Sequence, residues 1–169
     1  MGQRNYYLCQ FLFDGQRPYV IWASNNTDEL IRLSNGKIAT FRDESGAAEF
    51  CRVAGISLMA EPAVVYDFDR IAAWCTNAAI RDIDPAAFLN AWNMLDDAHS
   101  FKSGVRSLHE HSLSEAGYVY DKLFWANNLP SVTPIGTHYD PAWSEEDMKQ
   151  MSHIFRLGLA ELRASIAMS

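Results

Sequence analysis

The sequence has no surplus of positive charge, and this argues against direct binding to nucleic acid. It contains 14 Lys and Arg residues against 21 Asp and Glu residues, a formal net charge of −7 at pH 7. Contact with a phosphate backbone requires a basic face. We therefore expect no direct nucleic-acid partner. The acidic balance would suit a basic protein partner, although many proteins without one are equally acidic.

Long apolar runs and paired cysteines are also missing. No stretch approaches the ~18 consecutive apolar residues needed to span a bilayer, and residues 1–5 carry no charged-then-apolar signal pattern. Cys9, Cys51 and Cys75 are far apart and form no CxxC pair. This usage is typical of buried thiols in a reducing compartment. The sequence predicts a soluble cytoplasmic protein without membrane contact.

The chain lacks the common catalytic and cofactor motifs. There is no GxSxG, HExxH, GxGxxG or GxxxxGK[ST]. Gly15 and Gly36 lie in turn-like stretches and are not parts of a nucleotide-binding loop. We therefore expect a protein that is not an enzyme and that needs no cofactor.

Histidines provide the nearest approach to a metal site. His109 and His111 are two residues apart, a spacing that can chelate a metal from a strand but not from one face of a helix. His99 and either Asp96 or Asp97 lie upstream and could add ligands. The spacing matches no metal motif. We interpret the segment around His109 as a solvated loop and predict no metal site.

The first 66 residues predict a mostly antiparallel sheet. Residues 6–13 and 19–23 are rich in β-favouring side chains and flank a turn at 14–18, which indicates a hairpin. A second hairpin is expected over 29–42, because Asn35-Gly36 favours a type I′ turn. A short helix over 28–34 is the alternative there.

One helix is expected within this sheet-rich half. Asp43 is a candidate N-cap for a helix over 43–53, which Gly55 would end. Residues 56–60 and 64–66 are expected to be extended. The face of the helix that should be buried consists of Ala47, Phe50, Cys51 and Ala54.

Residues 67–169 predict a group of helices packed on the sheet. Asp67 can cap a helix over 68–75. Asp84 followed by Pro85 is a strong signal for the start of the next helix, which should end between 97 and 100. The apolar stripe of that second helix consists of Phe88, Ala91, Trp92 and Leu95.

The last two helices are expected to flank a rigid connection. A helix over 112–128 begins at Ser112 or Ser114, and the final helix begins at Ser144 with Asp147 completing a capping box. Proline and glycine stiffen the connection at Pro130, Pro134, Gly136 and Pro141. The predicted buried positions are Ala116, Tyr120, Leu123 and Phe124, then Met148, Met151, Phe155, Leu159, Leu162 and Ile166. Aromatic and apolar anchors, expected to fix both helices against the sheet, are Leu123, Phe124, Trp125 and Trp143.

The whole chain, 1–169, is thus predicted to be a single α+β domain with a sheet-rich half, 1–66, and a helical half, 67–169. Acidic residues gather in the helical half, where Arg70 and Arg81 are the only basic residues between 62 and 101. Some of these carboxylates are expected to cap helices, and the others could simply be solvated. An acidic surface would accelerate association with a cationic partner. The candidate partner-binding residues are Asp67, Asp69, Asp82, Asp84, Asp96, Asp97, Glu145 and Glu146.

Several segments within about residues 64–147 contain helix caps, aromatic side chains and rigid turns. They are Tyr66-Asp67-Phe68-Asp69 with Trp74, Phe88-Leu89-Asn90-Ala91-Trp92-Asn93 with Asp96-Asp97, Leu123-Phe124-Trp125-Ala126-Asn127-Asn128-Leu129-Pro130, Thr133-Pro134 and Pro141-Ala142-Trp143-Ser144. Together these segments resemble small bacterial immunity proteins, the antidotes encoded beside polymorphic and contact-dependent growth-inhibition toxins. Because the shared features are structural, the resemblance indicates a fold more than a partner.

The resemblance implies a cytoplasmic protein that binds one cognate toxin domain and blocks its active site. Toxins of such systems are often nucleases with basic surfaces, which an acidic inhibitor would cover. The alternative is a small enzyme or ligand-binding domain with a pocket between sheet and helices, lined by Asp, His and Tyr. A purely structural subunit is a third reading.

Overall fold

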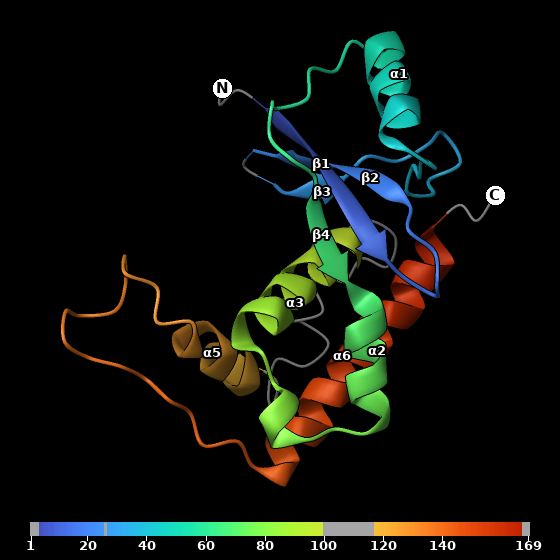
Figure 1. Cartoon of the computed structure of the whole chain (residues 1–169). Helices are drawn as coiled ribbons and strands as arrows, with labels where there is room; N and C mark the ends of the chain where they lie inside the picture. The colour runs from blue at the N-terminus through green and yellow to red at the C-terminus, as the bar shows by residue number, and fades with distance from the viewer. Residues whose placement is uncertain (1–3, 26, 100–116, 167–169) are drawn as a thin grey trace.

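The structure is a computed structural model that describes residues 4–25, 27–99 and 117–166. It has an α+β architecture in which a four-stranded sheet lies between one helix and a group of helices (Figure 1). This confirms the predicted fold class. The segment around His109, which was interpreted as a solvated loop, lies outside the described residues.

The sheet has the strand order β3-β2-β1-β4. Strands β1 (Asn5–Leu12), β2 (Tyr19–Ser24) and β3 (Glu29–Leu30) pair antiparallel, whereas β4 (Val64–Asp67) pairs with β1 in parallel. The first predicted hairpin is therefore confirmed. The chain returns to β1 through a long connection that contains a helix, and such a crossover permits parallel pairing. The sheet is mixed, with its antiparallel pairs on one side of β1.

The two hairpin turns differ in type. In the first turn both Asp14 (φ 52°) and Gly15 (φ 72°) have positive φ, the pattern of a type I′ turn. In the second turn Gly36 has a φ of 79°, whereas Asn35 has no positive φ. The predicted type I′ turn at Asn35-Gly36 is therefore wrong.

Hydrogen bonds explain the second turn. Gly36 N donates to Leu33 O at 2.8 Å, and Leu33 N donates to Lys37 O at 2.8 Å. These bonds enclose a three-residue loop, 34–36, in which a type I turn is followed by a left-handed glycine. Arg32 and Ile38 form an antiparallel bridge beyond the loop. The hairpin itself is thus confirmed, and the helical alternative over 28–34 is excluded.

Helix α1 (Glu44–Ala54) covers the sheet face opposite the other helices (Figure 1). The Asp43 carboxylate accepts a hydrogen bond from Gly46 N at 2.8 Å, and Gly55 ends the helix with a φ of 67°. Both predicted ends are confirmed. Ala54 is exposed and was wrongly placed on the buried face. The buried apolar residues between α1 and the sheet are Ile21, Ala23, Ala39, Ala47 and Cys51.

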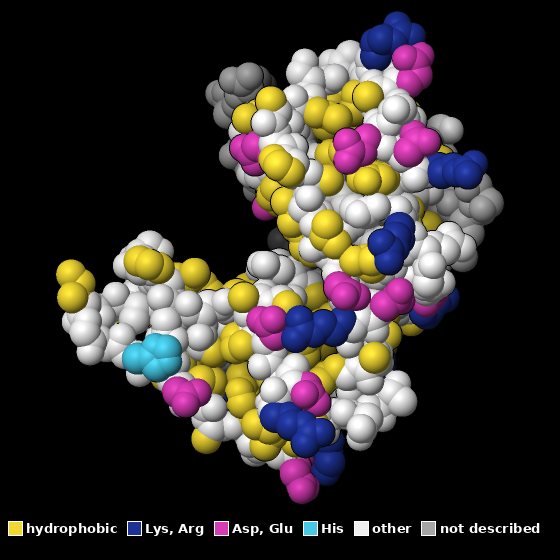
Figure 2. Space-filling model, in the orientation of Figure 1, with side chains coloured by type: hydrophobic (Ala, Val, Ile, Leu, Met, Phe, Trp, Pro, Cys, Tyr) yellow, Lys and Arg dark blue, Asp and Glu magenta, His cyan; other side chains and the backbone are white. Residues whose placement is uncertain are grey.

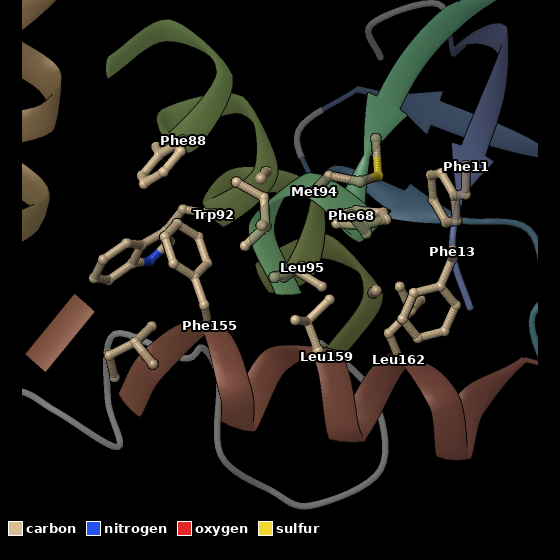
Figure 3. Packing of buried hydrophobic residues seen from close by; sticks show 14 of the residues in the cluster. Phe11, Phe13, Phe68, Phe88, Trp92, Met94, Leu95, Phe155, Leu159 and Leu162 are labelled. Carbon is tan, nitrogen blue, oxygen red and sulfur yellow. The ribbon is translucent and has the colours of Figure 1, made fainter. Parts of the chain in front are cut away.

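The main core lies on the other face of the sheet, among α2 (Phe68–Thr76), α3 (Pro85–His99), α5 (Gly117–Ala126) and α6 (Glu145–Ser165), with a short 3-10 helix at Ile80–Asp82. Figure 3 shows aromatic and aliphatic side chains from the sheet, α2, α3 and α6 packed together. The predicted stripe of α3 is buried, as are Met151, Phe155, Leu159, Leu162 and Ile166 of the last predicted face. Sheet-rich and helical halves therefore share one core.

Local capping sets the helix starts as predicted. Asp67 Oδ1 accepts from Arg70 N at 2.9 Å, and Asp84 Oδ1 accepts from Ala87 N at 3.2 Å. Ser144 and Asp147 form the expected capping box at α6. The predicted caps Ser112 and Ser114, together with Ala116, lie outside the described residues.

Helix α5 departs from expectation because it packs on α3 and α6 and lies beyond α3 as seen from the sheet (Figure 1). It is not fixed against the sheet, and Trp125 is 45% exposed and is not a core anchor. Leu123 is buried as predicted, and Phe124 is half-buried. Val119, which was not in the predicted stripe, is fully buried. Surfaces on α3 and α6, which local periodicity does not reveal, select this face.

Candidate functional site

An acidic hollow lies where the sheet meets α3. Its volume is about 400 Å³, and carboxylate, amide and aromatic side chains surround it. Among the described residues, none that lines the hollow is basic. We call this site the acidic hollow. Its lining residues are Trp22, Asp28, Tyr66, Asn90, Asn93, Met94, Asp96 and Asp97.

Elementary periodicity explains how these residues meet. On α3, Asn90, Asn93 and Asp97 follow one another at steps of three and four, so they share a helix face. On β2, Val20 and Trp22 are two residues apart and therefore share the face of the sheet that points to the helices. Val20 belongs to the main core, and Trp22 packs against it. The meeting of these two faces forms the hollow.

The Asp97 carboxyl group of this site is strongly perturbed. Trp22 Nε1 donates a hydrogen bond to Asp97 Oδ2 at 2.9 Å. Burial raises the pKa of Asp97 to about 6; the Trp22 hydrogen bond opposes this rise, and the negative charges of Asp28 and Asp96 add to it. The ionised carboxylate is thus held where its charge costs free energy, and a cation placed beside it would offset that cost.

Two further side chains complete the lining. Asp28 Oδ1 is buried and accepts no hydrogen bond from the described residues. Burial is the main reason why the pKa of Tyr66 lies well above its usual value, and the neighbouring Cys9 and Asp97 raise this pKa further. Tyr66 therefore stays neutral and able to donate its hydroxyl proton at physiological pH. At the rim, the Tyr120 hydroxyl donates to Asn93 Oδ1 at 2.9 Å, which ties α5 to the site.

The structure brings only two of the eight predicted binding residues into this hollow, namely Asp96 and Asp97. Asp67 caps α2, and Asp69 accepts a hydrogen bond from Gly15 N at 3.1 Å, at the turn between β1 and β2. Glu145 and Glu146 lie in the first turn of α6. These carboxylates occupy separate parts of the fold.

The remaining two predicted residues have basic neighbours. Asp84 forms an ion pair with Arg70 at 3.2 Å, and Asp82 lies 3.7 Å from the Arg81 guanidinium. Both acids and both arginines line a second hollow of about 680 Å³. Because the charges of this second hollow compensate one another, it attracts a cation less strongly than the acidic hollow does.

A third hollow, of about 540 Å³, lies beside the first half of α6. Lys149, His153 and Arg156 line it together with Glu145. Its mixed charge sets it apart from the acidic hollow.

Sequence reasoning missed Asp28, Trp22 and Tyr66 as members of the site. Trp22 and Tyr66 were read only as strand residues, and Asp28 lies in a polar loop. These residues join the site only because β2 and β4 pack against α3. Knowledge of the strand order would have indicated that they lie near α3.

The histidine candidates give no metal site in the part of the chain that the structure describes, where no group of three or more His, Cys, Asp or Glu side chains could hold a metal ion. His99 is buried at the end of α3, with Nδ1 3.7 Å from Glu161 Oε2. His109 and His111 lie outside the described residues. Cys9, Cys51 and Cys75 are buried free thiols, as expected.

Comparison with protein-family models, with curated proteins and with solved structures finds no match for this chain. None of the described helices is both long and apolar enough to cross a membrane. The functional argument therefore rests on the chain's own residues.

Proposed function

We propose that this chain is a cytoplasmic immunity protein that binds and neutralises a cognate toxin domain with a basic surface, a nuclease being the chemistry that such a surface fits. The observation that carries the proposal is the acidic hollow, in which the half-buried Asp97 lies beside Asp28 and Asp96 and no described lining residue is basic. The resemblance to immunity proteins, with their helix caps and aromatic anchors, agrees with this function.

The hollow fits a Lys or Arg side chain of a partner. A cation entering it would interact with a partly desolvated carboxylate, where charge–charge attraction is stronger than in water. Trp22 and Tyr66 add aromatic surface, on which a planar guanidinium can stack. Because a neighbouring cation favours the ionised form, binding would lower the pKa of Asp97 and release a proton.

The charge of the whole protein supports the same interaction. A net charge of −7 attracts a basic domain over a distance and raises the association rate. Once bound, an acidic protein would occupy the surface on which a nuclease holds phosphates. Neutralisation would then follow from occupancy and requires no catalysis by the inhibitor.

Protection of growing cells tests the proposal. The C-terminal domain of the protein encoded immediately upstream would be induced in a bacterial host, with the wild-type chain or an Asp96→Asn/Asp97→Asn variant produced beside it. We expect the wild type to restore growth and the variant to lose most of this protection.

The matched control is Glu44→Gln/Glu49→Gln. It changes the net charge by the same amount on α1, which covers the opposite face of the sheet. The control should protect like the wild type. If the wild-type chain neither binds that domain nor protects against it, the proposed function is wrong.

A small ligand is the second candidate, because the hollow lies between sheet and helices, where the alternative reading expects a pocket. The raised pKa of Asp97 would suit proton transfer to or from a bound cationic compound. Arginine or a diamine that raises the melting temperature at millimolar concentration, and loses this effect with Asp97→Asn, would favour this candidate over a protein partner.

A further inference from the structure

The 18-residue connection between α5 and α6, residues 127–144, forms a projection that we call the arm (Figure 1). It has no helix or strand. Connections longer than about 12–15 residues without secondary structure are uncommon in compact domains, and ordered ones usually carry a function. None of the residues of the acidic hollow belongs to the arm.

Internal hydrogen bonds hold the arm in one shape. Asn128 Nδ2 donates to Tyr139 O at 2.9 Å, and Tyr139 N donates back to Asn128 Oδ1 at 2.7 Å. The Thr137 hydroxyl donates to Pro134 O at 2.6 Å. At its base, Lys122 Nζ donates to Ala142 O at 2.9 Å. The arm is therefore preorganised.

This ordered arm exposes apolar side chains. Of the thirteen exposed large apolar side chains among the described residues, four lie in the arm and two on the adjoining helix α5. Ile135 is 105% exposed, the highest value among these side chains. Figure 2 shows hydrophobic side chains gathered along the projection at the left of the view. The six are Tyr118, Trp125, Leu129, Val132, Ile135 and Tyr139.

Charge around the arm selects what can cover these side chains. The arm contains Asp140 and no Lys or Arg, and Glu145 and Glu146 follow it in the first turn of α6. Lys122 at the base is engaged by Asp147, with Nζ 2.6 Å from Oδ2. Contact between two arms would bring like charges together, and an anionic lipid surface would be repelled. A partner that offers an apolar pocket with a basic rim complements both properties.

We infer that the arm is a second docking surface, which inserts Ile135 into an apolar pocket with a basic rim on the same toxin domain that the acidic hollow engages. This inference rests on the proposed function. The hollow supplies charge attraction, and the arm supplies a preorganised apolar anchor. Preorganisation lowers the ordering cost of association.

The test compares affinities for the upstream-encoded C-terminal domain, purified in a catalytically inactive form. Ile135→Ser removes the anchor without touching the core. Val53→Ser is the matched control, since Val53 is 73% exposed on α1. Truncation of a centrally placed anchor side chain weakens binding about 30-fold. We expect a loss of that size for Ile135→Ser and less than about 2-fold for Val53→Ser.

Other outcomes separate the two proposals. Unchanged binding by Ile135→Ser, with weakened binding by Asp96→Asn/Asp97→Asn, overturns the role of the arm and leaves the proposed function in place. Absence of any wild-type binding overturns both. Dimerisation in sedimentation, or flotation with phosphatidylglycerol vesicles, that Ile135→Ser abolishes would assign the arm to a second copy or a membrane and overturn the inference.

Discussion

The surroundings of Asp97 disfavour its ionised form, and this makes the free energy of unfolding depend on pH. Its pKa is raised to about 6 in the folded protein, against about 3.9 for an unperturbed aspartate. Between these values the folded state binds more protons than the unfolded state, so the free energy of unfolding falls as pH rises. Above about pH 6 the whole cost is present.

Asp97→Asn should therefore stabilise the protein at neutral pH. Asparagine carries no charge and its Oδ1 can still accept the Trp22 hydrogen bond. We expect a gain of about 1 kcal/mol above pH 6, allowing for partial exposure of the site, and no gain below about pH 4. Urea unfolding of both proteins across this pH range measures the difference. A loss of stability at neutral pH would contradict the assignment.

Lys122 and Asp147 form the most enclosed ion pair among the described residues, with side-chain exposures of 11% and 5%. Burial tends to raise the pKa of Asp147, but hydrogen bonds from Lys122 and Ser144 hold it below its usual value. The pair's stabilising contribution is thus present above the unfolded pKa and is lost as pH falls. Lys122→Ala should cost about 3 kcal/mol at neutral pH, because it leaves a buried carboxylate without its cation.

A double variant gives the control for this prediction. In Lys122→Ala/Asp147→Asn the buried charge is absent, and the asparagine keeps a side-chain oxygen for the capping box. Chemical denaturation should show that the double variant recovers at least about 1 kcal/mol relative to Lys122→Ala. Equal instability of the two variants would mean that the cation has no special role.

Residues whose role is local could be predicted from the sequence, and residues whose role is set at long range could not. Asp67, Asp84 and Ser144 cap helices that begin beside them. By contrast, Trp22, 75 positions away in the chain, binds Asp97. No local pattern contains that pairing.

Helices and strands show the same difference between local features, which the sequence predicts, and long-range features, which it does not. Apolar spacing predicted α1, α3 and α6 and the first hairpin, because each buries one face at its own period. The Asn35-Gly36 turn was assigned the wrong type, since the bond pattern around Leu33 decides how many residues the loop contains. The face of α5 that is buried depends on α3 and α6. The pairing of Ile38 with Ile166, which attaches the end of α6 to the second hairpin, had no sequence signal.

The arm provides a prediction at the scale of one element. Asn128→Gly removes both hydrogen bonds to Tyr139 and suits the positive φ of 47° at this position. The arm is exposed, so the free energy of unfolding should change by less than about 1 kcal/mol. Cleavage of the arm by thermolysin should accelerate roughly 10-fold, because local opening becomes easier. An unchanged cleavage rate would show that these bonds do not order the arm.

At the scale of the whole molecule, the acidic residues are unevenly distributed. Acidic groups are distributed over the surface, and the acidic hollow concentrates three of them, Asp28, Asp96 and Asp97, in a concave site. The sequence predicted the overall acidity and the α+β class. It could not predict which carboxylates would meet, because that depends on the packing of the sheet against α3.

Association with a basic domain should depend strongly on salt. Long-range attraction by a net charge of −7 is screened over about 8 Å at physiological ionic strength. Stopped-flow measurements should show the association rate falling at least about 10-fold between low and high salt, with a smaller change in the dissociation rate. An association rate that is independent of salt would contradict electrostatic steering.

The most direct measurement is the affinity of the wild type and of Asp97→Asn for the upstream-encoded toxin domain, by calorimetry at about pH 7.5 and about pH 5. About a tenth of Asp97 is ionised one pH unit below a pKa of about 6. Wild-type affinity should therefore fall up to about 10-fold at the lower pH, while Asp97→Asn binds weakly at both and lacks this pH-dependent loss. Equal affinities of the two proteins at about pH 7.5 would contradict the role of the acidic hollow.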